Sequence, residues 1–265
     1  MSARESDAHS GQTQPDMTQD RFRGKSIPSS PFSGDAGQAA PAVIDALAAY
    51  QAGTLDKYAA VAVLADTRLF VPVVAVLDTS EESEDGHEVE KDSHMATVSV
   101  QGPHGERGLL AFTCDSALTA WSALARPVPA LARSVAAAAL DEGADVLVID
   151  AQTDHTLMVD LPGILALAQG REWLAPITDP QVQEEISSCI GAVSMPVDVA
   201  FELRPGTGGA ELHLVLLAAP DGNREQVAAV AAGVARQLAE SELLRARLVG
   251  GVQLTVELLT PGAGS

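Results

Sequence analysis

Apolar residues follow two periods along this chain, a helical one and the alternation of strands, and together they predict a mixed protein. Within residues 41–64 apolar side chains recur at helical spacing, which predicts two short helices separated by Gly53, the second capped by Thr54. The run 69–76 is rich in β-branched residues and predicts a strand. Because Pro72 within it cannot donate to a ladder, we expect that strand at a sheet edge or with a bulge.

The rest of the first half alternates strands with helices. Two apolar runs flank a Gly-Pro-His-Gly turn and predict a hairpin, and a later run of four apolar residues is typical of a strand buried on both faces. In chain order the pattern predicts a hairpin of 96–100 with 109–112, helices over 115–121 and 129–140, strands at 146–149 and 157–159, and a helix through 164–167. This part ends near Trp173, ahead of a linker at 176–180.

The final part of the chain carries the clearest alternation. Three segments alternate apolar with polar residues, and each predicts a strand with one apolar and one wet face. A helix begins after the capping residue Asn223, and its apolar stripe runs through Leu238. The predicted elements are a helix over 180–190, strands at 197–203, 212–216 and 252–258, and the Asn223 helix between the last two strands. We expect an αββαβ sandwich in which one helix covers one side of an antiparallel sheet, whose opposite face meets water or a partner.

These elements define an α+β protein of two domains, each a mixed or antiparallel sheet covered by helices. We expect a disordered tail at 1–40, because this segment is polar and lacks the apolar surface that could offset its ordering entropy. An N-terminal domain then covers 41–175, and the small αββαβ domain covers 176–265. Since 46% of the residues are hydrophobic, both domains can bury a core.

The charge balance narrows the range of partners. The 265 residues include 16 basic and 36 acidic ones, a net charge of −20. A field of this sign repels phosphate backbones and anionic lipids, which argues against nucleic acid and membrane surfaces as partners. Two cysteines are too few for a disulfide framework, and no signal peptide or apolar window of roughly 18 residues is present. We expect a reduced, cytoplasmic, acidic protein.

The segment Gly108–Trp121 reads GLLAFTCDSALTAW, a strand ending in Leu-x-Ala-Phe-Thr that turns into a helix with an Ala-Trp pair. Together with LFVPV at 69–73 and VLVID at 146–150, it resembles the N-terminal domain of the SseB family, the enhanced serine sensitivity proteins of actinobacterial type. The resemblance covers roughly 41–175, and 176–265 is similar to the smaller C-terminal domain that often accompanies it. Because the family has no assigned catalytic residues, the resemblance implies a fold and a host but no chemistry.

The best candidates for a ligand site lie where strands end. Cys114 and Asp115 stand at a strand-to-helix turn, where a helix N-terminus lowers a thiol pKa. Asp150, Asp154 and His155 follow a buried strand, whose carboxyl end is where ligands often bind. However, Cys114 departs from the small polar residue that the resemblance implies, and no imidazole stands at a diagnostic spacing from it. The alternatives are an ordinary capping or core cysteine and a turn in which Asp154 binds backbone donors. We assign no catalytic residue.

Nothing in the sequence predicts a metal or a cofactor. The acidic loop 81–94, with His87 and His94, could collect a divalent cation, but it lacks the regular spacing of a calcium loop and favours a solvated, mobile segment. Glycine motifs that cradle phosphates and the Gly-x-Ser-x-Gly elbow are absent. The glycines of 206–209 predict a hairpin turn. We expect Trp121 to pack in the core rather than to anchor a partner protein.

Two functions remain open. The first is a non-enzymatic protein-binding or assembly module, because no complete catalytic constellation is present and the C-terminal sheet has a face or edge free for another protein or a second copy. On that open face the candidate interface residues are Ala200, His213, Val215 and Thr255. The alternative is a small-molecule binder or enzyme linked to amino-acid (serine) metabolism, with its site at the end of the N-terminal sheet.

Overall fold

The computed structural model describes residues 32–77, 93–103, 105–195, 199–220 and 222–259, and the side chains at 75–77 and 93–96 are not described. The chain divides into two units between Ala36 and Gly37. In the first unit, the Asp35 N–H donates to the Phe32 carbonyl across 3.0 Å and closes a turn. The second unit holds all the helices and strands named below. The tail predicted at 1–40 lies mostly outside the described residues, as does most of the acidic loop at 81–94.

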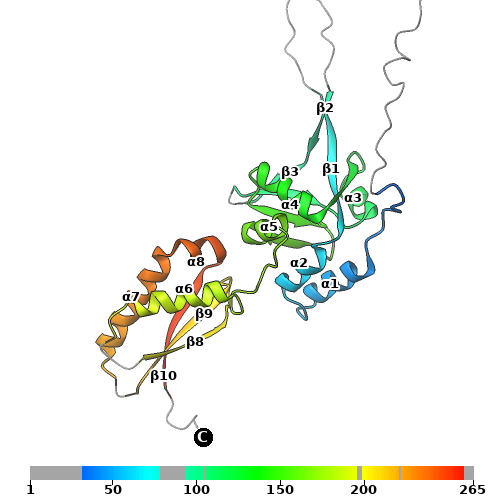
Figure 1. Ribbon diagram of the computed structural model, residues 1–265. Coiled ribbons are helices and arrows are strands. Elements are labelled where there is room, and N and C mark those ends of the chain that lie inside the picture. The colour runs from blue at the N-terminus through cyan, green and yellow to red at the C-terminus, as the bar shows by residue number, and fades with distance from the viewer. Residues whose placement is uncertain (1–31, 78–92, 104, 196–198, 221, 260–265) are drawn as a thin grey trace, which may run out of the picture. The chain divides into compact units, whose positions relative to one another are not determined.

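The protein is α+β, as predicted, with helices packed on three sheets (Figure 1). The helices are α1 (Pro41–Gln51), α2 (Lys57–Leu64), α3 (Asp115–Trp121), α4 (Ala132–Asp141), α5 (Leu161–Ala168), α6 (Pro180–Gly191), α7 (Arg224–Glu240) and α8 (Glu242–Arg247). The strands are β1 (Arg68–Leu77), β2 (Ser93–Thr97), β3 (Ser99–Gln101), β4 (Arg107–Ala111), β5 (Arg126–Leu131), β6 (Val146–Ile149), β7 (Leu157–Asp160), β8 (Val199–Pro205), β9 (Leu212–Ala218) and β10 (Val252–Leu258). The sheet orders are β2-β1-β5, β3-β4-β6-β7 and β10-β9-β8.

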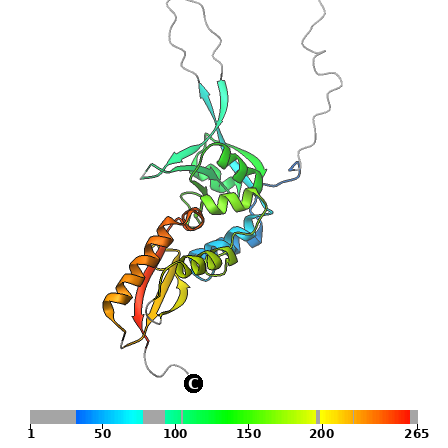
Figure 2. The same ribbon diagram turned by 60° about the vertical axis from the view of Figure 1, so that its left-hand side comes forward.

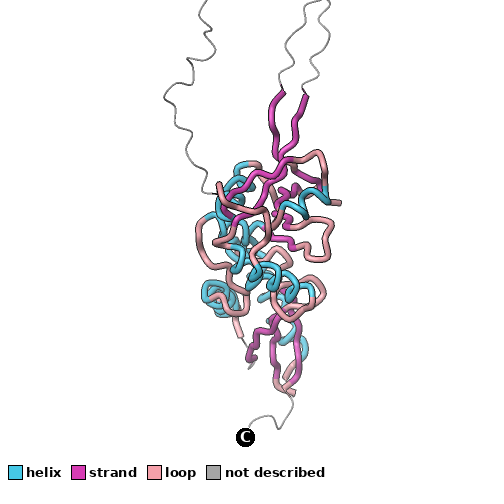
Figure 3. Tube along the Cα trace, turned by 90° about the vertical axis from the view of Figure 1, so that its right-hand side faces the viewer, coloured by secondary structure: helices cyan, strands magenta, loops and turns pink. Residues whose placement is uncertain are grey.

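Pro72 lies in a central strand, so the predicted edge position for β1 was wrong. Its neighbour Phe70 exchanges backbone hydrogen bonds of 2.7 and 2.8 Å with Phe112, at the end of β4. The ladder with β2 begins one residue beyond Pro72. Between the pairing with Phe112 and the ladder with β2, Pro72 takes part through its carbonyl oxygen alone. This oxygen accepts a hydrogen bond from the Val98 N–H across 3.3 Å. A proline is tolerated here because β1 changes its neighbour at the position where an N–H would be needed. Figure 3 shows β1 and β2 continuing together past the strands next to them.

The helix predicted from residue 129 begins at Ala132, because the preceding residues form the edge strand β5. Pro127 and Pro129 lie opposite Pro72 and Phe70 of β1. Since Phe70 directs its backbone groups away from β5, these opposed pairs are not hydrogen-bonded, and the proline nitrogens face the open edge. The two prolines therefore protect that edge from pairing with another chain.

Helix α2 is capped by a different residue than predicted. The Asp56 carboxylate accepts from the Ala59 N–H across 2.8 Å, which satisfies a donor of the first turn. Thr54 instead donates its hydroxyl to the Ala49 carbonyl at the end of α1, across 3.1 Å. Both residues suit a cap, but the helix begins two residues later than its pattern indicated.

The C-terminal sheet is mixed rather than antiparallel, which corrects the prediction for residues 176–265. Strands β8 and β9 pair antiparallel across the predicted turn at 206–209, whereas β9 and β10 pair parallel. The parallel pairing follows because α7 and α8 connect β9 to β10 as a crossover. Both α6 and α7 pack on one face of the sheet, and Figure 2 shows α7 alongside β10. The short helix α8 was not predicted.

Three hydrophobic cores lie within the described residues. The largest holds Trp173, a small one surrounds Phe112, and the third joins α6, α7 and α8 to the C-terminal sheet. Trp121 packs on the Phe112 core as predicted, with ring centroids 5.7 Å apart. Each core draws its residues from one side of the boundary predicted at 175, which itself stays a prediction.

Lys57 ties α2 to the start of α5. Its Nζ lies 2.6 Å from a carboxylate oxygen of Asp160, the residue in the N-cap position of α5. The same ammonium lies 5.1 Å from the ring centroid of Trp173, which Tyr58 meets edge-on at 4.6 Å. A cation over an aromatic face and an ion pair thus hold these helices on the main core.

Candidate functional site

Asp150 and Thr113 meet where the parallel strands β4 and β6 end. Asp150 is buried and has a left-handed φ of 51°. Its carboxylate accepts from the Thr113 N–H across 2.7 Å and from the Thr113 hydroxyl across 2.6 Å, while its own N–H donates to the Ala111 carbonyl at 2.9 Å. The carboxylate thus continues the β4–β6 ladder beyond its last backbone pair.

The turn after β6 is closed by its own hydrogen bonds. The hydroxyls of Thr153 and Thr156 each donate to the Asp150 carbonyl across 2.8 Å. Burial raises the pKa of Asp150, and the hydrogen bonds from Thr113 and the positive charge of His155 lower it by less. A second left-handed residue, Gln152 with φ 63°, completes the turn. Asp150 therefore has the local role of a strand-end cap.

The structure brings together only two of the five predicted ligand residues. His155 is close enough for its charge to act on Asp150, and its Nδ1 is buried without a hydrogen-bond partner among the described residues. Asp115 and Asp154 are exposed. Cys114 is half-buried, and its Sγ lies 3.2 Å from the hydroxyl oxygen of Ser116. No pairing of the thiol with an imidazole occurs within the described chain, so these residues form no nucleophile–base pair there.

The second cysteine has no reactive environment. Cys189 is buried in the C-terminal core, and burial raises the pKa of its thiol, with the charge of Glu185 acting in the same direction. A protonated, enclosed thiol is a packing residue, which agrees with its position on the buried side of α6.

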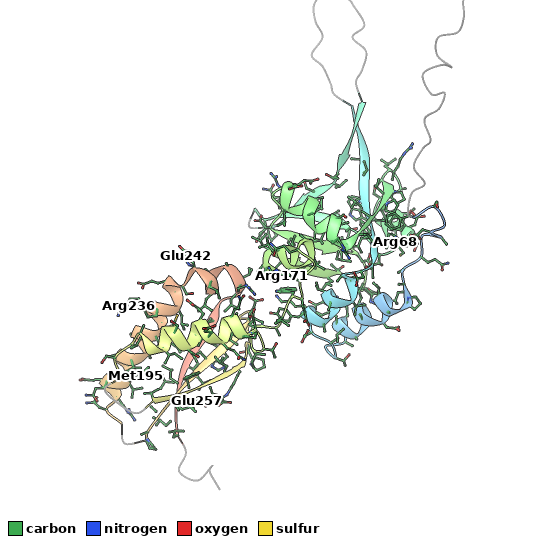
Figure 4. All side chains as sticks on the ribbon, in the orientation of Figure 1. Arg68, Arg171, Met195, Arg236, Glu242 and Glu257 are labelled. Carbon is green, nitrogen blue, oxygen red and sulfur yellow. The ribbon has the colours of Figure 1, made fainter. Side chains whose placement is uncertain are left out.

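The predicted open face of the C-terminal sheet is covered by its own charged side chains. Arg204 reaches from β8 across β9 and binds Glu257 of β10 at 2.8 Å and Glu202 at 2.9 Å. Val215, in the register between Glu202 and Thr255, is fully buried beneath this network. Figure 4 labels Glu257 on β10. This face is therefore polar and ion-paired rather than an apolar surface.

The other predicted interface residues share this polar face. His213 Nε2 and the Thr255 hydroxyl oxygen are 2.7 Å apart, so the two side chains bind each other. Ala200 is exposed near the start of β8. The four residues thus lie on one face as expected, but three of them are occupied by neighbours.

Exposed apolar side chains gather instead along the free edge of β10. Val256 and Leu258 are 42% and 58% exposed, and they point to the helix face of the sheet. Two hollows lie beside them. The α8 hollow, 260 Å³, is lined by Ala235, Leu238, Ala239, Leu244, Arg245, Leu248, Gly251, Val252 and Leu254, and the α7 hollow, 220 Å³, by Gly222, Arg224, Val227, Ala228, Val256 and Leu258. The alternation of β10 was visible in the sequence, but its position at an edge depends on the parallel pairing.

Some backbone N–H and C=O groups of β10 also point to its open edge, away from β9. The Leu259 N–H donates to the Ala218 carbonyl at 2.8 Å, and the Gly251 carbonyl accepts from the Glu211 N–H at 3.1 Å. Odd-numbered residues of β10 therefore direct their backbone groups to β9. The even-numbered ones direct theirs to the open edge.

A third hollow lies within residues 61–173. This α2–α4–α5 hollow, 290 Å³, is lined by Val61, Ala62, Ala65, Asp66, Arg133, Leu167, Gly170, Arg171, Glu172 and Trp173. Its charged residues stand at helix ends that are far apart in sequence. One signal for this hollow was visible in the sequence, the glycine that ends α5. That glycine does not show which residues the side chain after it faces.

The described part of the chain contains no group of three His, Cys, Asp or Glu side chains that could hold a metal ion. The acidic loop 81–94, for which a cation site was weighed and not favoured, lies outside it, apart from the backbone of 93–94. Among the same residues, we find no helix with the length and apolar character that crossing a bilayer requires.

The fold and these features define an α+β protein with a strand-end cap in one part and an open sheet edge in the other. Residues 43–166 match the family model of the SseB protein N-terminal domain. The resemblance stated from GLLAFTCDSALTAW is thereby confirmed for this segment. No curated protein matches the chain, and no solved structure does.

Proposed function

We propose that this protein is a non-enzymatic assembly module that pairs with a second copy of itself through the free edge of β10. The observation that carries the proposal is a long edge strand with exposed Val256 and Leu258 beside two apolar hollows. Exposed strand edges pair readily with another strand, and flanking apolar pockets add affinity.

Among the described sheets, four of the five other edge strands differ from β10 in ways that discourage pairing, and the fifth, β2, is shorter, with five residues. Prolines protect β5, and β3 and β7 have only 3 and 4 residues. Strand β8 carries the Glu202–Arg204 pair and ends in Pro205. Strand β10 has seven residues without Pro, Lys or Arg, and its one acid, Glu257, is already paired with Arg204. Strand β10 therefore lacks the prolines and unpaired charges that keep sheet edges from pairing with one another.

A second copy supplies a complementary strand. In an antiparallel pair of β10 strands centred on Thr255, Leu254 lies opposite Val256 of the other copy, and Val252 lies opposite Leu258. The exposed pair Val256 and Leu258 then meets the strand residues that line the α8 hollow of the other copy. On the other face Gln253 lies opposite Glu257, so no like charges face each other. The interface is self-complementary, as two-fold symmetry requires.

The test is sedimentation velocity over a concentration series, with three variants of β10. Val256→Pro removes an outward N–H while sparing the ladder with β9, and Val256→Lys places a charge in the apolar row; we expect both to abolish the dimer. Gln253→Lys is the matched control, because it adds the same charge on the opposite face, facing Glu257 of the other copy, and leaves the dimer intact.

Circular dichroism establishes that each variant is folded. A wild-type protein that stays monomeric at every concentration would overturn the proposal. So would a dimer that Val256→Lys and Gln253→Lys weaken equally.

We also propose the finer parts of the family assignment. Residues 176–265 are the smaller C-terminal domain that accompanies SseB-like N-terminal domains, and the observed αββααβ order, which contains the expected αββαβ elements and the additional α8, supports this assignment. An actinobacterial source is supported by 13 Arg against 3 Lys. A cytoplasmic location and the lack of nucleic-acid partners rest on two cysteines and the charge of −20.

One observation favours the alternative function, a small-molecule site at the strand ends. The buried His155 Nδ1 has no partner among the described residues, and Asp150 beside it is held in a left-handed conformation. Nuclear magnetic resonance of the His155 imidazole in the presence of metabolite mixtures tests this alternative. A shift confined to His155 and its neighbours supports it, and unchanged signals count against it.

A further inference from the structure

We propose that the α2–α4–α5 hollow binds a small zwitterion, a molecule with a carboxylate, an ammonium group and an apolar body. This inference is independent of self-association, because the hollow draws on residues 61–173 only. It is carried by a fixed apolar floor and by a rim that presents both signs of charge.

The floor of the hollow is part of the main core. Val61, Leu167 and Trp173 are all buried members of that core and also line the hollow. The Trp173 ring is fixed by Gly163, where an added Cβ would lie 2.7 Å from the ring. A floor held this firmly offers preformed apolar surface to a ligand.

One guanidinium is positioned by the end of α5. Gly170, with φ 63°, donates to the Leu167 carbonyl at 3.0 Å, and the Arg171 N–H donates to the Ala166 carbonyl at 2.8 Å. This Schellman motif sets Arg171 at the rim, where Figure 4 labels it on the segment after α5. Its Nε donates to the Gln169 side chain at 2.7 Å. Its two terminal nitrogens make no hydrogen bond to the described residues and suit a carboxylate.

The second guanidinium lies in the first turn of α4. Arg133 Nη2 is 3.0 Å from the Asp66 carboxylate, and these side chains are 54% and 90% exposed. A single contact between exposed groups is weak, so the pair can separate at little cost. Arg133 is then available to a ligand carboxylate and Asp66 to a ligand ammonium.

The mixed charges of the rim favour a ligand that carries both signs over one with a single charge. Asp66 and Glu172 repel a bare anion, while Arg133 and Arg171 repel a bare cation. A zwitterion matches both pairs at once, and its apolar body lies on Leu167 and Trp173. The ligand class therefore follows from the charges at the rim and the apolar floor together.

Leucine and methionine are the probes, and 4-methylpentanoate and 3-methylbutylamine are the analogues of leucine that lack one charged group. Because Trp121 lies outside the hollow, a Trp121→Phe background leaves Trp173 as the reporting fluorophore. We expect leucine or methionine to change the Trp173 emission with saturation, and calorimetry to give the same affinity. Each single-charge analogue should bind roughly tenfold or more weakly, the cost of one lost charged hydrogen-bond pair.

Two variants assign the binding to this hollow. Arg171→Gln and Arg133→Gln should each weaken binding roughly tenfold. Arg126→Gln, an exposed residue of β5 outside the hollow, is the matched control and should leave binding unchanged. The proposal is overturned if neither amino acid binds, if an analogue binds equally well, or if the control weakens binding as much as Arg171→Gln. Val256→Lys, the dimer variant, should bind the probes normally, which separates this site from the proposed assembly.

Discussion

Asp150 combines burial, a left-handed backbone and two hydrogen bonds to a single residue, Thr113. Asp tolerates this conformation better than most residues because its short side chain can bind nearby backbone. The sequence predicted that Asp150 follows a buried strand. It did not predict the partner, because Thr113 follows β4, which becomes adjacent to β6 only when the two strands pair in parallel.

Replacing Asp150 with Ala should lower the free energy of unfolding by about 1–3 kcal/mol, because the buried Thr113 N–H and hydroxyl lose their acceptor. Asp150→Asn keeps an acceptor oxygen and should cost less. Chemical denaturation monitored by circular dichroism measures both. Equal losses for Ala and Asn would show that the hydrogen bonds to Thr113 are not what stabilises the turn.

The raised pKa of Asp150 makes a prediction with a definite sign. Because the folded pKa lies above the ordinary value of 3.8, folding favours the protonated form. The stability that this group contributes is present below its ordinary pKa and is lost as pH rises through the raised value. The difference in unfolding free energy between wild type and Asp150→Asn should therefore fall with rising pH in that window. A difference that grows with pH would contradict the burial of a destabilised carboxylate.

At the scale of elements, most N-terminal strands and helix bounds followed from periodicity, but β5 was missed, and β2 and β3 were predicted as one strand at 96–100. Pro72 was assigned to an edge and residues 129–131 to a helix, because local pattern does not show which neighbour a strand has. The change of partner beside Phe70 makes Pro72 acceptable in a central strand. The mixed pairing of β10 was missed for the same reason.

The packing of α5 on the main core predicts a strong effect from one methyl group. In Gly163→Ala, the added Cβ would lie 2.7 Å from both Trp173 and Val159, so we expect a loss of about 1–3 kcal/mol in unfolding free energy. Gly191→Ala, at the end of α6, meets nothing within 4 Å and should be neutral or slightly stabilising. Thermal melts compare the two. A Gly163→Ala protein as stable as wild type would mean that Trp173 can move aside.

At the scale of the whole molecule, the net charge of −20 opposes association between copies. Salt screens this repulsion, so the proposed dimer should strengthen as ionic strength rises. Association of the same edge with a basic partner would weaken instead. Sedimentation at low and high salt distinguishes the two, and a dimer that dissociates with added salt would point away from the apolar row of Val256 and Leu258.

The placement of the aromatic residues decides how the unfolding of this protein can be observed. Both tryptophans, Trp121 and Trp173, belong to cores that precede residue 175, and the core joining α6, α7 and α8 to β9 contains none. Indole emission during denaturation therefore reports on the first two cores and is silent about the third. If calorimetry resolves a transition that this emission does not follow, that transition belongs to the C-terminal sheet and its helices.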